Sequence, residues 1–382
     1  MLKPYFTKIN LFKVALILSA SALTLTKAYK SKFNSADDYK RILSQRELKK
    51  DIDLLVYTFE NGYGGKDYLK TEVVEFTNTL KRVIADYPNG LELYKLQIII
   101  DESLKKIPDG HLAVSADEPA RTERSPASLD ATCKTNKESH FEELNLQGKK
   151  TLVATIPSFL ISDQANQKNL VDTFSEKLSK SDSLILDLRG NRGGYENIPL
   201  QLAARLWGEP YREENTIQYY PMPIKLTNYL KNKLVYTLWS NNETEFENRK
   251  IPTQEEDFLA YTQEDLNLYL DDPPHLQENG FPKPIYILVD GYCASACERM
   301  LEATEMHPNV KVIGEKTAGA VQFGGVGTLA LPESHLIVSI PTGRIEYTDN
   351  RKVEKIGYTP SILVGKEEDA LTKAVSLLKT NL

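Results

Sequence analysis

Two short apolar segments, each followed at once by a turn rich in small residues, most constrain how this chain can fold. Ser183–Leu188 reads SLILDL, and Pro284–Val289 reads PIYILV. Strands this apolar are typical of a sheet whose two faces are both covered by helices. Helices are expected after both of them, near 199–206 and 297–306. Because strands and helices alternate from residue 151 onward, the pattern predicts an α/β fold.

Three amphipathic helices are predicted ahead of this region. The first begins at Ser44-Gln45-Arg46-Glu47, which has the form of a capping box, and two more are expected near 76–87 and 91–105. We therefore predict an N-terminal helical domain over 29–115 and an α/β domain over 116–382. Residues 209–283 are rich in Tyr, Asn, Glu and Pro, and they are interpreted as a large insertion in the second domain.

The first 28 residues have the pattern of a secretory signal peptide. Residues 1–36 contain six lysines and no acidic residue, and an uncharged stretch runs from Val14 to Thr26. Small residues that suit cleavage end at Ala22 and at Ala28. The pattern predicts export to a periplasm or to the outside of the cell. A buried N-terminal helix and an uncleaved membrane anchor are the alternatives.

Charge and cysteine content exclude some classes of protein. With 47 basic and 53 acidic side chains the net charge is −6, so a strongly basic nucleic-acid binder is not expected. Three cysteines are too few for a disulfide scaffold. Cys293 and Cys297 are interpreted as small packing residues at the start of a helix, while pairing of one of them with Cys133 stays open. They offer too few ligands for a metal site, and no cofactor is expected.

Two turns that follow the apolar segments are candidates for chemistry, and each has a structural alternative. Residues 187–194 read DLRGNRGG, whose glycine N–H groups can face an anion or simply form a tight turn. Ser295 lies in the second turn, where a serine can act as a nucleophile with the next N–H stabilising an oxyanion. Ser295-Ala296-Cys297-Glu298 also has the form of a capping box, with Ser295 as the N-cap.

A serine nucleophile needs a base and a group that orients the base. His111, in Asp109-Gly110-His111, is one of five histidines, and histidine is the usual base at neutral pH. Glu354, before a glycine near the C-terminus, is a carboxylate that can orient a histidine. Each of these residues, taken alone, is more often purely structural.

The order of the motifs resembles the S41 family of serine peptidases, which includes the C-terminal processing proteases and the tricorn-type core. The matching segments, in family order, are Asp109-Gly110-His111, Ser158-Phe159, 187–194, 294–298, Gly314–Gly319 and 354–360. The resemblance implies a ClpP/crotonase-like α/β fold and hydrolysis of peptide bonds in a peptide or protein substrate.

The resemblance also implies roles for individual residues. Ser295 matches the nucleophile, and the N–H of Ala296 together with Gly193 or Gly194 matches the oxyanion hole. The processing proteases use a lysine as base, but that position is Ala320 here and Lys316 is out of register. The tricorn-type arrangement, a histidine with a late glutamate, matches His111 and Glu354 and is the one predicted.

Two further expectations concern the whole protein. Residues 112–150 are too few for the PDZ module that is common in processing proteases, so that module is expected to be absent. The alternative to an enzyme is an inactive relative that binds an apolar ligand or a peptide, in which Ser295 would act only as an N-cap.

Overall fold

A computed structural model describes residues 40–116, 138–161, 163–208, 233–238, 258–262, 280–347, 350–365 and 368–381. The predicted signal peptide (1–28), Cys133 and most of the predicted insertion (209–283) lie outside these residues. Within the described ranges, no helix has both the length and the apolar character that crossing a membrane requires.

The apolar segments predicted as buried strands lie at the centre of a six-stranded sheet. They form β6 (Ser183–Asp187) and β9 (Ile285–Val289), which pair in parallel and are buried at every residue. The sheet order is β13-β10-β9-β6-β5-β4, and only β4 is antiparallel to its neighbour. The remaining strands are β4 (His140–Leu146), β5 (Lys149–Thr155), β10 (Val310–Gly314) and β13 (Ile362–Leu363).

Helices cover both faces of this sheet, which confirms the predicted α/β fold and explains why the central strands are apolar throughout. The four helices are α5 (Gln164–Ser179), α6 (Asn197–Trp207), α9 (Ala296–Thr304) and α10 (Ala370–Asn381). Leu184 and Ile287 belong to one core cluster together with α5, α6 and α9. Ile185 and Leu288 face the other way, into a second cluster with α10. Strand alternation thus divides one sheet between two cores.

The N-terminal helices form the second part of the molecule. They are α2 (Gln45–Asn61), α3 (Lys70–Asp86) and α4 (Leu93–Leu104), accompanied by the short strands β1 (Ile42–Leu43) and β2 (Leu91–Glu92). The capping box predicted at the start of the first helix is present: Glu47 N–H donates to the Ser44 hydroxyl, and Glu47 accepts from the Ser44 N–H.

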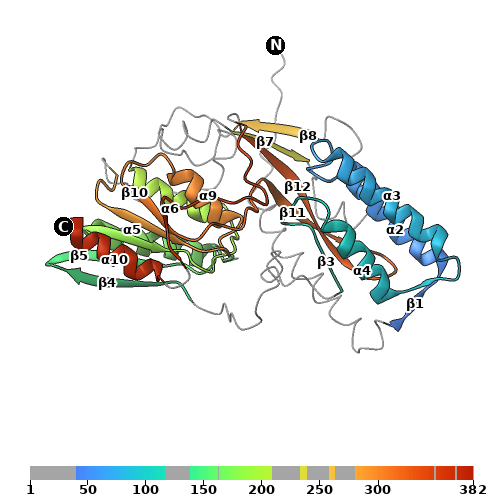
Figure 1. Ribbon diagram of the computed structural model, residues 1–382, viewed down its shortest axis with the longest axis horizontal. Coiled ribbons are helices and arrows are strands. Elements are labelled where there is room, and N and C mark those ends of the chain that lie inside the picture. The colour runs from blue at the N-terminus through green and yellow to red at the C-terminus, as the bar shows by residue number, and fades with distance from the viewer. Residues whose placement is uncertain are drawn as a thin grey trace, which may run out of the picture.

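A second sheet packs against these helices (Figure 1). Its order is β11-β12-β7-β8. β3 pairs with residues 337–339 of β12, on the edge opposite β11 that β7 occupies farther along the strand. The strands are β3 (Ala113–Ser115), β7 (Lys233–Leu238), β8 (Phe258–Thr262), β11 (Phe323–Ala330) and β12 (Ile337–Tyr347). The sequence pattern did not predict β11 of this sheet, nor β4 and α10 of the α/β part.

The helices and this second sheet share one hydrophobic core. Phe59 and Leu80 of the helices lie in the same cluster of buried residues as Phe323, Val338 and Ile340 of β11 and β12. Since these strands come from the far end of the chain, the helical region is completed by residues more than 200 positions away. The domain boundary at 115/116 remains a prediction, but the packing crosses it.

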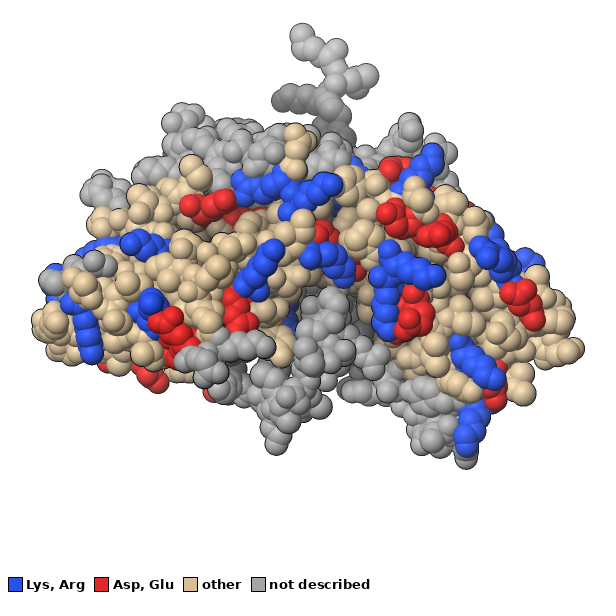
Figure 2. All heavy atoms as spheres, viewed as in Figure 1, with Lys and Arg blue, Asp and Glu red and all other residues tan. Residues whose placement is uncertain are grey.

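The face of the molecule in Figure 2 carries acidic and basic side chains interspersed over both parts. Many charged side chains of the described residues form exposed ion pairs, such as Lys49 with Asp53 on α2 and Lys168 with Asp172 on α5. Exposed pairs of this kind contribute at most about 1 kcal/mol each, so the stability of both parts comes from their cores.

The shared core predicts that Leu80→Ala destabilises the protein. Leu80 is fully buried, and removing a buried leucine side chain lowers the free energy of unfolding by about 2–5 kcal/mol. Val74, on the same helix but 49% exposed, provides the matched control, and Val74→Ala is expected to stay within about 0.5 kcal/mol. Urea denaturation of both variants measures the difference. Equal midpoints would contradict the shared core.

Candidate active site

Ser295 lies in a sharp turn between β9 and α9, with a backbone conformation that is unusual for a residue with a side chain. Its φ is 55° and its ψ −121°, and it directly precedes the first residue of the helix, Ala296. Non-glycine residues at positive φ are strained and persist only where the surroundings hold them. Strain of this kind is concentrated at functional sites, which makes the turn a candidate for one.

The capping box predicted at Ser295 is present. The Glu298 carboxylate accepts from the Ser295 N–H at 3.3 Å, and the Ser295 hydroxyl faces the Glu298 N–H, although it makes no full cap hydrogen bond. Ser295 therefore belongs to the start of the helix, whether or not its hydroxyl also takes part in chemistry.

Gly193 lies directly against the turn that carries Ser295. A Cβ placed on Gly193 would be 2.8 Å from the Ser295 Cβ and 2.8 Å from the Ala296 nitrogen, and Gly193 has a φ of 94°. Both the contact and the conformation therefore require glycine. The predicted oxyanion residues Gly193 and Ala296 are brought together by this contact.

The three predicted oxyanion donors are not equally free. The Gly193 N–H donates to the Asn191 side-chain oxygen at 2.8 Å, so it is already occupied. In the described part of the chain, the N–H groups of Gly194 and Ala296 make no hydrogen bond. Gly194 is held by its neighbours, since the Tyr195 N–H donates to the Phe159 carbonyl and the Phe159 N–H donates to the Gly193 carbonyl. The available pair is Gly194 and Ala296.

Glu298, which the sequence placed in a capping box and in the 294–298 segment without assigning it a role in the site, is a central residue of the site. Its fully buried carboxylate accepts from four donors: the Thr317 hydroxyl (2.6 Å) and the N–H groups of Gly319 (2.8 Å), Ala320 (2.8 Å) and Ser295 (3.3 Å). Burial raises the pKa of Glu298 to about 7, although the donors lower it. The residue joins the start of α9 to the 317–320 loop.

His111 lies in a short loop between α4 and β3, next to a buried carboxylate. The Asp109 Oδ1 accepts from the His111 backbone N–H at 2.8 Å, and the Asp109 Oδ2 accepts from the Tyr63 hydroxyl at 2.9 Å. Burial raises the pKa of Asp109 to about 6. Burial, followed by the charge of Lys355, lowers the pKa of His111 to about 4, so the imidazole is neutral at pH 7.

Glu354 lies beside the His111 loop but contacts its backbone rather than the imidazole. Its Oε1 accepts from the Gly110 N–H at 2.7 Å, and its Oε2 accepts from the N–H groups of Val321 (3.1 Å) and Gln322 (3.0 Å). Burial and the nearby charge of Asp109 raise the pKa of Glu354 to about 7. Its predicted role of orienting the imidazole by direct contact is not seen.

A continuous path of contacts connects Ser295 with His111. It runs from the Ser295 N–H to Glu298, from Glu298 to Ala320, and from Ala320 to Gly110, whose added Cβ would lie 2.6 Å from the Ala320 Cβ. Within the described residues, no hydrogen bond joins the Ser295 hydroxyl to the imidazole. Such bonds are often long in an enzyme without substrate.

The chain has no lysine at position 320, where the processing proteases of the family have their base. Ala320 is buried against Gly110, and Lys316 is exposed. Lys355 is the lysine whose charge acts on the imidazole, and it does so by disfavouring the protonated form.

Cys293 and Cys297 form a disulfide bond with each other, a pairing that the sequence did not predict. Their Cα atoms are 5.4 Å apart, and Ser295 lies midway between them in the chain. Both cysteines are fully buried in the α/β core, as expected for packing residues. Pairing of one of them with Cys133, which the sequence left open, does not occur, because the strand-to-helix turn brings their own side chains together.

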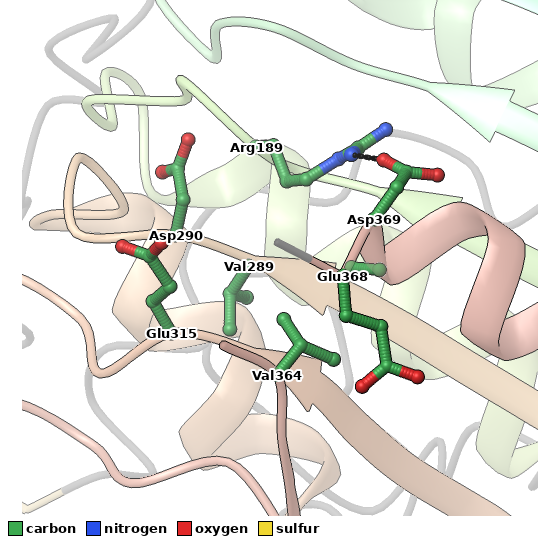
Figure 3. Close-up of a pocket in the computed structure, with 8 residues that line it drawn as sticks. Arg189, Val289, Asp290, Glu315, Val364, Glu368 and Asp369 are labelled. Atoms are coloured by element: carbon green, nitrogen blue, oxygen red, sulfur yellow. Dashed lines mark hydrogen bonds and ion pairs between the residues drawn. The ribbon is translucent and has the colours of Figure 1, made fainter. Parts of the chain in front are cut away.

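A separate pocket of about 320 Å³ lies at the carboxyl ends of β6, β9 and β10. Asp290 and Glu315 line one side of it, and Arg189, which is paired with Asp369, lines the other (Figure 3). None of the predicted catalytic residues lines this pocket. Among the described residues, no group of three or more His, Cys, Asp or Glu side chains is arranged to hold a metal ion.

Comparisons with known proteins identify the family and similar folds. The family model described as Peptidase family S41 matches residues 150–364. A lipoprotein from Streptococcus agalactiae has 18% sequence identity and a TM-score of 0.52, with 88% of this chain and 96% of that chain covered. A structure described as mature CPAF has 11% identity and a TM-score of 0.52, with coverage of 88% and 96%.

A candidate peptidase from Parabacteroides merdae has 16% identity and a TM-score of 0.53, with 88% of this chain and 97% of that chain covered. At such identities these likenesses concern the fold. They extend over the helical part as well as the α/β part, since each covers most of both chains.

The disulfide predicts how many thiols the protein exposes on denaturation. Alkylation without reduction is expected to modify Cys133 alone among the three cysteines, because Cys293 and Cys297 are joined. Reduction should also lower the free energy of unfolding by about 2 kcal/mol, because the unfolded chain then regains the conformational entropy that the short closed loop had removed. Mass spectrometry of the alkylated peptides and urea denaturation measure the two effects. Three modified cysteines before reduction would contradict the bond.

Proposed function

Because the chain belongs to peptidase family S41, we propose that it is an exported serine endopeptidase that cleaves peptide or protein substrates through an acyl-enzyme on Ser295. Family membership supports a peptidase-type function and a serine protease. The observation that carries the assignment to Ser295 is its strained turn at positive φ, which places the residue directly before the N–H of Ala296, a group that makes no hydrogen bond within the described residues.

In the proposed reaction, His111 takes the proton of the Ser295 hydroxyl as its oxygen attacks a peptide carbonyl. His111 is available for this because its imidazole is neutral at pH 7 and its side chain retains 16% exposure. The lowered pKa makes it a weaker base than a free histidine, so contacts that stabilise the imidazolium are needed during the reaction. The N–H groups of Ala296 and Gly194 receive the developing oxyanion, and each such donor typically contributes about 3 kcal/mol. The imidazolium then protonates the leaving amine, and water releases the acyl group.

Glu354 takes part in this proposal through the backbone. By accepting from the Gly110 N–H, it fixes the peptide that immediately precedes His111. By accepting from the N–H groups of Val321 and Gln322, it holds the same loop against the segment that leads into β11.

Two observations support export. The N-terminal 28 residues have the basic start, apolar stretch and small residues of a signal peptide. The Cys293–Cys297 disulfide favours the same interpretation, because disulfides form and persist mainly in oxidising compartments.

The proposal predicts that a fluorophosphonate probe labels the protein at Ser295. Ser295→Ala should abolish labelling, and His111→Gln should slow it by about 10²-fold or more, because the hydroxyl then lacks its base. Gel fluorescence and mass spectrometry of the labelled peptide provide the measurement. A wild-type protein that takes no label, under conditions where other serine hydrolases do, would favour the inactive binding protein instead.

Ser44 offers a matched control for this experiment, since it is the N-cap of α2 and has a complete capping box. Ser44→Ala should lower the free energy of unfolding by about 1 kcal/mol and leave labelling unchanged. If Ser295→Ala behaved like Ser44→Ala in both respects, Ser295 would be only an N-cap.

Export predicts where the mature chain begins. Expression of the full sequence in a host with a secretory pathway should yield a secreted or periplasmic protein whose first residue is Leu23 or Tyr29, after cleavage at Ala22 or Ala28. N-terminal sequencing of the purified protein checks this. Recovery of the intact N-terminus in the cytoplasmic fraction would exclude a cleaved signal peptide.

A further inference from the structure

The imidazole of His111 has a buried nitrogen that is left without a partner. Its Nδ1 makes no hydrogen bond within the described residues. The nearest carboxylate oxygen is the Asp109 Oδ1 at 3.9 Å, and no other described carboxylate lies within ion-pair distance of the ring. A catalytic histidine needs an acceptor at the nitrogen that does not face the serine, because that contact sets the tautomer and stabilises the imidazolium.

Glu354 is poorly available for this contact. Its Oε1 is engaged by the Gly110 N–H, and its Oε2 by the N–H groups of Val321 and Gln322. Turning the carboxylate toward the imidazole would leave these buried N–H groups unpaired, which is unfavourable.

Asp109 is arranged differently. Its Oδ2 is held by the hydroxyl of Tyr63, which is fully buried, and its Oδ1 accepts only the His111 backbone N–H. A carboxylate oxygen can accept a second hydrogen bond, so Oδ1 retains capacity toward Nδ1. A small rotation of the ring would bring the two atoms within hydrogen-bond distance, and a positive charge on the imidazole favours that movement.

We propose that Asp109, held by Tyr63, is the positioning residue that accepts the His111 Nδ1–H during the reaction, while Glu354 acts on the backbone of the loop. The inference rests on the proposed roles of Ser295 and His111. It gives Tyr63 a function as well, because the hydroxyl of a residue in the helical part fixes the carboxylate on which the imidazole depends.

In the described part of the chain, the ionisable side chains that act on the loop of the imidazole are the carboxyl groups of Asp109 and Glu354 and the ammonium group of Lys355. The charge of Lys355 acts on both carboxyls and on His111. Burial and the charge of Asp109 raise the pKa of Tyr63 well above its usual value, so Tyr63 stays a neutral donor.

The test uses the full chain and a fluorophosphonate probe. During labelling, the Ser295 oxygen forms a bond to phosphorus, fluoride leaves, and the hydroxyl proton passes to His111. Asp109→Asn is expected to lower the rate constant of inactivation by about 10²-fold or more, while the probe's binding constant changes by less than about threefold.

A spectroscopic signal separates this role from a structural one. In the labelled protein, enriched with ¹⁵N-histidine, the Nδ1–H of His111 should give a strongly deshielded proton resonance, identified by its loss in His111→Gln. Asp109→Asn should remove this resonance, and Glu354→Gln should retain it. Loss of the resonance in Glu354→Gln together with its retention in Asp109→Asn would overturn the proposal.

Asp51 provides a matched control, because it is also a fully buried aspartate that accepts two N–H groups, those of Glu333 and Ser334. Asp51→Asn should match Asp109→Asn in melting temperature but label like the wild type. If wild-type labelling depends on Ser295 and His111 yet Asp109→Asn labels like Asp51→Asn, the proposal for Asp109 fails. If labelling does not depend on Ser295, the proposed function fails first.

If the Asp109→Asn variant does not fold, the Tyr63→Phe variant is used for the same test. Removing the hydroxyl leaves more negative charge on the Asp109 carboxylate, so the His111 Nδ1–H resonance is expected to shift in the labelled protein. An unchanged resonance in Tyr63→Phe would contradict the contact.

Discussion

The buried carboxylate of Glu298 is the interaction on which the geometry of the candidate site most depends. It lies in the first turn of α9 and accepts from the Ser295 N–H on one side and from three donors of the 317–320 loop on the other. Without it, four buried donors would be unpaired, and the hydrogen bond from the Ala318 N–H to the Cys293 carbonyl would have to hold that loop to the turn. A glutamate three residues after the serine thus positions both the turn and its surroundings.

An ion-pair network centred on the buried Arg299 and Glu302, with the half-exposed Glu196 at its edge, fixes the same helix from another direction. Arg299 pairs with Glu302 and Glu196, and Glu302 also accepts from the hydroxyls of Tyr347 and Tyr358. Glu196 follows Gly194 by two residues, so Arg299 connects α9 with the glycine turn that lies against Ser295. Breaking one partner of such a buried pair is strongly destabilising, and the network favours one relative position of helix and turn.

Local patterns in the sequence predicted the local features of this structure. The capping box at Ser44, the doubly covered strands β6 and β9, and the turn that carries Ser295 each depend on neighbours in the chain, and each is present. The family resemblance and the α/β fold followed from the order of these segments.

What could not be predicted depends either on residues that are distant in the sequence or on the direction in which near neighbours point. Glu354 contacts the backbone of Gly110, and Tyr63 contacts Asp109, because folded strands and loops bring them together. The Cys293–Cys297 bond depends on the direction of two side chains at a turn, and Gly193 loses its predicted availability to its near neighbour Asn191. Residue type and spacing do not reveal where the two cysteine side chains point or which acceptor the Gly193 N–H meets.

The candidate site draws on two separate hydrophobic cores, and this determines what keeps it assembled. Ser295 and Gly193 are positioned by the α/β core, whereas Tyr63 and the His111 loop are positioned by the core shared between the helices and β11–β12. Among the contacts that cross from one to the other are carboxylates accepting backbone N–H groups: Glu298 toward Ala320, and Glu354 toward Gly110 and Val321. Burial places the pKa of both carboxylates near 7, so the seam between the cores is formed by groups whose charge is highly sensitive to their surroundings.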